Sequence, residues 1–243
     1  MRSIVGPPRT LRSVAKRLLS FTNLGQGVNV SAVTSPLVWE HVQPPAARRL
    51  LTGAIDAFAE RGFQATTTRD IASRAGMSPA ALYVHYPSKE RLLFEISLYG
   101  HRAALEILSQ AESGDASGSA PLAVTAGSGR TPADRLRAMV SAFTAWHAEH
   151  HTIARVVQYE LAALSPEHFA EVATIRRAIS ALIEQVLTDG IADGSFAVDD
   201  LHGTTLAVLS LSIDVARWYS PARQDPTELG ALYADLALRM VQV

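Results

Sequence analysis

The chain has 243 residues, 48% of them hydrophobic, which predicts a folded globular protein with a sizeable core and excludes intrinsic disorder. The absence of cysteine excludes disulfides and thiolate metal sites, and no apolar run approaches the roughly 20 residues that span a bilayer, so we expect a cytoplasmic protein without a membrane partner. Residues 1–100 carry 12 Lys and Arg against 6 Asp and Glu (+6), and residues 101–243 carry 10 against 17 (−7), so the front half favours a polyanionic partner.

Residues 1–44 differ in composition from the rest of the chain. They are rich in Gly and Pro, and their first acidic residue is Glu40. We expect a flexible basic N-terminal extension, which could contact DNA phosphates or be a dispensable tail. Its basic residues are Arg2, Arg9, Arg12, Lys16 and Arg17.

One long helix is predicted before the segment at 66–87 and another after it. A helical period begins at Pro45 and predicts a first helix that stops at Arg61–Gly62. Further along, Ser88 is a suitable N-cap for a long helix that runs to about Ala111. The apolar face of the first helix consists of Leu50, Leu51, Ala54, Ile55, Ala57 and Phe58.

Two short helices are predicted in the segment between them. Threonines at 66–68 are good N-cap residues for the first short helix, which Gly76 ends. Ser78 caps the second, Pro79 suits its first turn, and Pro87 breaks it. A helix followed by two short helices around a tight turn predicts a helix-turn-helix, which places its second short helix in the major groove of DNA.

The second short helix, Pro79 to about Tyr86, is the candidate recognition helix. The small side chains of Ala80 and Ala81 allow close approach to base edges, and their methyl groups can contact the thymine methyl. Tyr83 and His85 carry donors suited to phosphates, and phosphate contacts fix the register of a protein on DNA.

The flanking residues add further candidate contacts. Thr68 and Arg69 open the first short helix, where amide groups favour phosphate and the guanidinium of Arg69 can pair with a guanine edge. Ser78 opens the recognition helix, and Lys89 opens the long helix, where we expect it to bind a phosphate. Leu82 is expected to turn inward. Taken singly, each of these residues could instead belong to the core or to a solvated face.

The string TTTRDIASRAGMSPAALYVHYPSKERLL at 66–93 resembles the TetR-type family of bacterial transcriptional repressors. The resemblance implies an all-α homodimer in the nucleoid that binds a palindromic double-stranded DNA operator. It implies an N-terminal helix-turn-helix three-helix DNA-binding domain at 45–92 and a C-terminal helical ligand-binding and dimerisation domain at 93–243. Position by position, it implies DNA contacts at Thr68, Arg69, Ser78, Ala80, Ala81, Tyr83, His85 and Lys89.

The rest of the chain is predicted to be helical as well. A segment rich in Gly, Ser and Ala at 112–131 predicts a long mobile loop between the front module and the rear helices. No segment has the pattern of a strand, so the fold class is all-α. The further helices are expected at 132–149, 152–163, 166–189, 199–219 and 226–241.

The rear helices also predict a dimer interface. The helix at 199–219 is apolar around its circumference, and the helix at 226–241 is rich in leucine. These two helices predict a four-helix interface of the kind this family uses, and the alternative is an ordinary monomer core. The leucines of interest include Leu206, Leu209, Leu211, Leu229, Leu232, Leu236 and Leu238.

A pocket for a small hydrophobic effector is expected among the helices at 132–193 and the end of the long helix that runs to about Ala111. The sequence RWYSP at 217–221 and the helix at 166–189 are similar to TetR-type regulators of lipid or sterol catabolism that sense acyl-CoA thioesters. That resemblance implies that an arginine such as Arg155, Arg176 or Arg177 meets a phosphate, or that the loop at 112–131 gates entry. The candidate ligand-binding residues, each of which could instead be packed core, are Phe143, Trp146, His147, Val156, Tyr159, Leu182 and Val186.

The sequence contains no convincing pattern of a metal site or of a catalytic site. His147 and His151 lie four residues apart and His150 is adjacent, but no third ligand has convincing spacing, so we interpret this cluster as a solvated helix end without a metal. The chain lacks the G-x-S-x-G, P-loop and G-x-G-x-x-G patterns, so we expect neither an enzyme nor a cofactor. The remaining alternative is a helical protein-interaction module without sequence-specific DNA binding.

Overall fold

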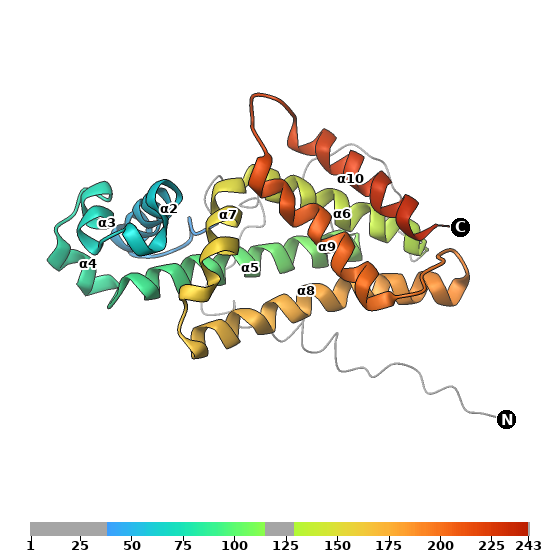
Figure 1. Cartoon of the computed structure of the whole chain (residues 1–243), viewed down its shortest axis with the longest axis horizontal. Helices are drawn as coiled ribbons and strands as arrows, with labels where there is room; N and C mark the ends of the chain where they lie inside the picture. Colours follow the sequence, from blue (N-terminus) through green and yellow to red (C-terminus); the bar gives the residue numbers. More distant parts are fainter. Residues whose placement is uncertain (1–37, 115–128, 243) are drawn as a thin grey trace.

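A computed structural model describes residues 38–114 and 129–242, and over these ranges the fold is all-α (Figure 1). Most of the predicted N-terminal extension and of the predicted 112–131 loop lies outside the described residues. In the described part, Phe196 and Gln242 form an isolated bridge and there is no strand. The helices are α2 (Pro45–Ala65), α3 (Thr68–Arg74), α4 (Pro79–His85), α5 (Lys89–Ser113), α6 (Pro132–Glu149), α7 (His151–Glu160), α8 (Pro166–Asp193), α9 (Leu201–Trp218) and α10 (Pro226–Val241), with a 3-10 turn at Leu161–Ala163.

The helices begin where local chemistry allows an N-cap. Ser88 accepts a hydrogen bond from the Arg91 amide at 2.9 Å and so caps α5. Thr131 and Asp134 form a capping box at the start of α6. The end of α2 differs from the prediction, because Gly62 takes a positive φ of 76° and the chain then continues in helical turns to Ala65.

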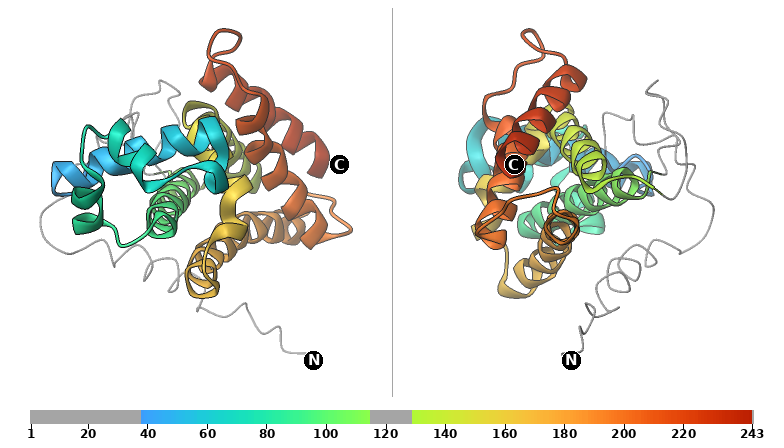
Figure 2. Two further views of the ribbon diagram at one scale, coloured as in Figure 1. Left: turned by 60° about the vertical axis from the view of Figure 1, so that its left-hand side comes forward. Right: turned by 90° about the vertical axis from the view of Figure 1, so that its right-hand side faces the viewer.

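The molecule has a small end and a larger helical body. The short helices α3 and α4 pack with α2 at one end, and α5 runs from beneath them into the body formed with α6–α10 (Figures 1 and 2). The larger of two hydrophobic core clusters in the described residues extends from Trp39 to Val241 and includes residues of both parts, and the smaller one consists of Ala148, Val215, Tyr219 and Leu229. The two parts are therefore joined by continuous packing as well as by the helix α5.

The closest helix packing within the body is between α6 and α10. A Cβ atom at Gly230 would lie 2.5 Å from the Ser141 carbonyl oxygen, so only glycine permits this approach. Arg137 of α6 and Asp235 of α10 form an ion pair across the same contact. Further along α6, the Thr144 hydroxyl donates to Ser212 of α9 at 3.0 Å.

Candidate nucleic-acid interface and ligand cavity

The two short helices are held by their own caps. The hydroxyl of Thr67 accepts from the Asp70 amide and lies within bonding distance of the Asp70 carboxylate, at 2.6 Å. The hydrogen bonds that this carboxylate accepts from the Thr67 hydroxyl and then from the Thr67 amide lower the pKa of Asp70. Of the three predicted cap threonines, Thr67 is therefore the one that caps α3. After the turn, where Gly76 has a φ of 66°, Ser78 caps α4 by accepting from the Ala81 amide at 3.2 Å.

The α4 helix separates a buried face from an outward face. Leu82 is fully buried, as expected, and Tyr86 is buried with its hydroxyl donating to the Ala47 carbonyl at 3.3 Å. Burial raises the pKa of the Tyr86 phenol. On the opposite face, the exposed fractions of Tyr83 and Val84 are 53% and 80%. A short helix with this outward face is what a major-groove reader requires.

The predicted DNA contacts gather on the outer surface of α3 and α4. The Thr68 hydroxyl of α3 and the Tyr83 hydroxyl of α4 are 3.1 Å apart, so two of the predicted residues are hydrogen-bonded to each other across the two helices. The predicted residues that are exposed are Arg69, Ser78, Ala80 and Tyr83, and those that are partly buried are Thr68, Ala81, His85 and Lys89.

Lys89 is turned toward the protein. Its ammonium donates to the carbonyl oxygens of Phe63 at 2.6 Å, Thr66 at 2.8 Å and Gln64 at 3.4 Å. Burial lowers the pKa of Lys89. The side chain that was expected to bind a phosphate therefore satisfies the last carbonyl groups of α2.

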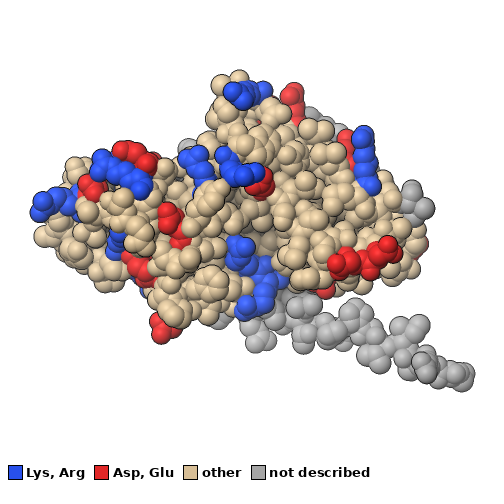
Figure 3. All heavy atoms as spheres, in the orientation of Figure 1, with Lys and Arg blue, Asp and Glu red and all other residues tan. Residues whose placement is uncertain are grey.

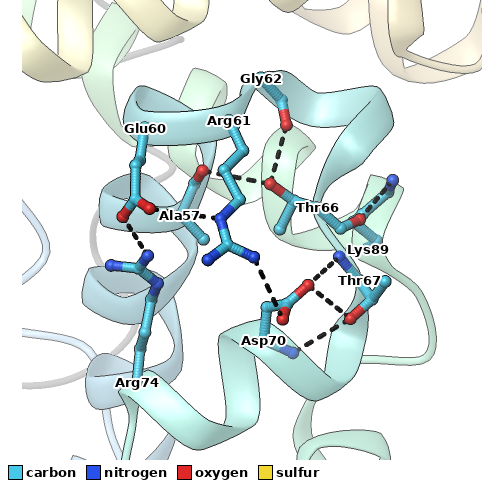
Figure 4. A network of polar contacts seen from close by, with 9 residues as sticks. All are labelled: Ala57, Glu60, Arg61, Gly62, Thr66, Thr67, Asp70, Arg74 and Lys89. Atoms are coloured by element: carbon cyan, nitrogen blue, oxygen red, sulfur yellow. Dashed lines mark hydrogen bonds and ion pairs between the residues drawn. The ribbon is translucent and has the colours of Figure 1, made fainter.

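A polar network stabilises the junction between α2 and α3 (Figure 4). Glu60 pairs with both Arg61 and Arg74, and Arg61 also lies 3.6 Å from Asp70. Thr66 is buried and its hydroxyl donates to the Gly62 carbonyl at 2.8 Å. Two of these ion pairs, Glu60–Arg74 and Arg61–Asp70, join α2 to α3.

The surface charge of this end is mixed. On the face shown in Figure 3, basic and acidic side chains lie side by side over α2–α4. Of the +6 in residues 1–100, residues 1–44 contribute +4 (five basic, one acidic) and residues 45–100 contribute +2 (seven basic, five acidic). Most of the excess positive charge that suggested a polyanionic partner therefore belongs to the N-terminal segment.

A cavity of about 160 Å³ lies in the helical body among α5, α6, α7, α8 and α9. Its apolar wall is formed by Ala104, Phe143, Trp146, Ile153, Val157, Ile179, Leu209 and Ile213, and its polar groups come from His101, His147, Gln158, Arg176, Ser180 and Ser210. A larger open hollow of about 720 Å³ lies at the α6–α7 corner and the α9–α10 loop. The enclosed apolar wall of the smaller cavity suits a small ligand better.

The structure brings three of the seven predicted ligand-binding residues to this cavity. Tyr159 is 63% exposed, because α7 turns Ile153 and Val157 toward the cavity and presents Tyr159 on its other side. Leu182 is partly buried against the core, and Val186 is fully buried within it, as is Val156. The predicted residues that line the cavity are Phe143, Trp146 and His147.

Two histidines and an arginine form the charged and titratable part of the cavity wall. The Nδ1 atoms of His101 and His147 pair with the carbonyl oxygens of Ser97 at 2.7 Å and Phe143 at 2.8 Å. Burial lowers the pKa of His101 and of His147 to about 4, so both rings are neutral near pH 7. His101 was missed in the sequence because its place at the cavity depends on how α5 packs with α8.

The expectation of a solvated helix end at the histidine cluster is wrong. His147 is only 5% exposed, and His150 is equally buried with its ring stacked on Trp146. The reason is that α7 begins directly at His151 and covers the corner. The described residues include no group of three or more His, Asp or Glu arranged to hold a metal ion.

Three contacts made by Glu160 and Glu90 connect the helical body to α2 and to the first turn of α5. The Glu160 carboxylate at the end of α7 accepts from the Phe63 amide at 2.9 Å. Glu90 in the first turn of α5 accepts from the Ser165 amide at 2.9 Å and lies 2.7 Å from His168 Nδ1. Since α7 and α8 also line the cavity, a change there can reach the DNA-binding end through packed elements.

The outer faces of α9 and α10 carry exposed apolar side chains. Leu232, Leu236 and Met240 are spaced four residues apart and form one stripe on α10. Leu206 and Trp218 are exposed on α9. Leu209, Leu229 and Leu238, which were predicted for a dimer interface, are instead buried in the core of the chain.

Comparison with known proteins identifies the family. Residues 50–96 match the family model described as bacterial regulatory proteins of the tetR family. Residues 129–241 match the model for the tetracyclin repressor-like C-terminal domain. The chain belongs to the TetR family of transcriptional regulators. The first matched segment covers the helix-turn-helix end of the fold, and the second covers α6–α10 of the helical body.

Individual TetR-family proteins support the same assignment. The HTH-type transcriptional repressor KstR2 of Mycolicibacterium smegmatis is 32% identical over 191 residues, which are 73% of this chain and 82% of the relative. A tetR-family regulatory protein from Rhodococcus RHA1 is 42% identical, with a TM-score of 0.73, over 82% of this chain and 98% of that chain. The ketosteroid transcriptional regulator KstR2 of Mycobacterium tuberculosis is 26% identical, with a TM-score of 0.70, over 83% and 97% of the two chains.

This TetR-family regulator is therefore similar to repressors, and its relatives are regulators and not enzymes. The helix-turn-helix predicted from residues 66–93 is confirmed as the DNA-binding part of the family. In the described ranges, none of the helices is long and apolar enough to cross a membrane.

Proposed function

We propose that this TetR-family protein represses transcription as a homodimer bound to a palindromic operator, and that a small hydrophobic effector, an acyl-CoA thioester, releases it. The observation that carries the proposal is the α4 helix, which buries Leu82 and Tyr86 and leaves Tyr83 and Val84 exposed. An outward face of this kind has no partner within the described residues of the chain. It suits contact with base edges and phosphates.

The proposed DNA contacts are Arg69, Ser78, Ala80 and Tyr83, with Thr68, Ala81 and His85 beside them. Tyr83 is the central residue of the set because its hydroxyl also meets Thr68 of α3. The proposed contacts with backbone phosphates orient α4, while the small side chains at Ala80 and Ala81 allow it to lie deep in the groove.

The homodimer is proposed from the outer stripe of α10 and the neighbouring face of α9. Exposed apolar side chains at helical spacing are costly in water and are typical of a protein interface. A two-fold dimer would set two α4 helices about 34 Å apart, which is one turn of DNA and matches the two halves of a palindrome.

The cavity in the helical body supports an effector with a small apolar group. The effector can lower operator affinity only through a higher affinity for the released conformation. The contact between Glu160 of α7 and the Phe63 amide offers a physical connection between the two sites.

The test is selection of binding sites from a random duplex DNA pool by the purified protein. We expect an enriched inverted repeat. Tyr83→Ala should lose at least about tenfold in affinity for it, since a hydrogen bond to a charged phosphate contributes about 1.5–3 kcal/mol. Tyr159→Ala removes an equally exposed tyrosine from α7 and is expected to bind normally.

Two results would contradict the proposal. Selection without any enriched sequence, by a protein whose circular dichroism shows folded helices, would favour a protein-interaction module. Equal operator affinity of Tyr83→Ala and Tyr159→Ala would show that α4 does not read the DNA.

A further inference from the structure

The cavity wall contains one positive charge that the described residues do not neutralise. Arg176 of α8 lies at the cavity, and none of the ion pairs formed within the described part of the chain includes it. Its hydrogen-bond partner there is another cavity residue, His101, with Arg176 Nη1 and His101 Nε2 3.4 Å apart. A partly buried cation without an anionic partner loses hydration and gains little in return.

The protonation of His101 follows from its contacts. Since a carbonyl oxygen can only accept, the bond to Ser97 places the proton of the neutral ring on Nδ1 and leaves Nε2 as an acceptor for Arg176. His101 therefore orients the guanidinium without cancelling its charge. His147 has the same arrangement, with Nδ1 on the Phe143 carbonyl.

The size and wall of the cavity limit what can pair with Arg176. Its volume is about 160 Å³. An apolar cavity of about 150 Å³ accommodates benzene. Phe143, Trp146 and Ile179 supply apolar surface to the same cavity. The space therefore suits a group of about six carbon atoms that presents one oxygen acceptor.

We propose that the cavity binds a short branched or cyclic acyl group whose carbonyl or carboxylate oxygen accepts a hydrogen bond from Arg176, which His101 holds in place. The inference rests on the proposed effector function and adds the residue that recognises the polar end of the effector. Arg176 then contacts the acyl oxygen and not a phosphate. A free carboxylate and a thioester carbonyl share this chemistry, and the experiment separates them.

Isothermal titration calorimetry on the full chain measures the binding of three acids: pentanoate, isovalerate and cyclohexanecarboxylate. The same measurement is made with their coenzyme A thioesters and with the alcohols that have the same carbon skeletons. We expect at least one acid or thioester to bind, and the matching alcohol to bind at least about tenfold more weakly. Binding by the free acids alone identifies a carboxylate, and binding by the thioesters alone identifies a thioester carbonyl. Lack of binding by every compound overturns the proposal.

Matched arginine variants test the assigned residue. Arg176→Met should weaken binding of the acyl compound about 10- to 100-fold, because it removes a charged donor. Arg177→Met changes the next residue of α8, which is exposed and bonded to Thr174, and should bind as the unchanged chain does. Arg176→Lys keeps the charge and should recover part of the affinity.

Thermal unfolding of Arg176→Met shows whether Arg176 recognises a ligand or stabilises the fold. Replacement of an unpaired, partly buried cation by methionine should leave the midpoint of thermal unfolding unchanged or higher, whereas a structural arginine would lower it. Equal binding by Arg176→Met and the unchanged chain overturns the proposal and leaves the repressor function intact. If the DNA pool yields no enriched operator, the proposed repressor function is refuted. Calorimetry then still shows whether Arg176 binds the acyl oxygen.

Discussion

Lys89 lies beside the recognition helix, but its side chain stabilises the end of α2. Its ammonium donates to three carbonyl groups at the end of α2 and lies 4.2 Å from the centre of the Phe63 ring. Carbonyl groups at a helix end lack partners within the helix, so a cation there stabilises them. The position of Lys89 in the sequence, at the start of a helix after the recognition helix, gives no sign of this contact.

Lys89→Met is expected to lower the free energy of unfolding by about 1–3 kcal/mol, the cost of leaving partly buried acceptors without a donor. Urea denaturation followed by circular dichroism measures the effect. Arg49→Met removes an exposed cation from α2 and should change stability little. Unchanged stability with weaker operator binding would instead assign Lys89 to a phosphate.

At the scale of elements, the joint between α7 and α2 is one of the contacts between a helix that lines the cavity and the helix-turn-helix end. Glu160 ends α7, and its carboxylate accepts from the Phe63 amide just after the positive φ at Gly62. Gly62 interrupts the helical backbone there, and this places the Phe63 amide where a side chain from another helix can reach it.

Glu160→Ala should therefore loosen the end of α2. We expect hydrogen exchange of the amides at 60–67 to become at least about tenfold faster, because a hydrogen bond to a charged group contributes about 1.5–3 kcal/mol. Glu167→Ala, which removes an exposed carboxylate in the first turn of α8, is the control. Exchange that is equal in the two variants would show that this contact does not hold the joint.

The helix starts were predictable because their causes are local. Ser78, Ser88 and Thr131 cap the helices that follow them, as their types and positions indicated. The cavity was only partly predictable: Phe143 and Trp146 were found on an aromatic helix face, but His101 meets Arg176 only after two distant helices pack. Which side of a helix faces the cavity is a tertiary property.

At the scale of the whole molecule, the outer stripe of α10 is expected to determine the assembly. Leu232→Asp with Leu236→Asp places two charges on an apolar interface and should convert a dimer into a monomer, because charges there lose hydration without a partner. Sedimentation velocity measures the change. Phe169→Asp alters an exposed apolar residue of α8 and should leave the dimer intact. A dimer that persists in the double variant must use another surface.

The continuous core has a consequence for engineering this protein. A chimera that joined residues 38–88 to the ligand-binding body of another regulator would lose Glu160 as the acceptor for the Phe63 amide. It would also lose Lys89 as the donor to the Phe63 and Thr66 carbonyl oxygens at the end of α2. A working graft would have to carry the start of α5 and the end of α7 together with the helix-turn-helix, so specificity for DNA and for effector cannot be exchanged at one splice point.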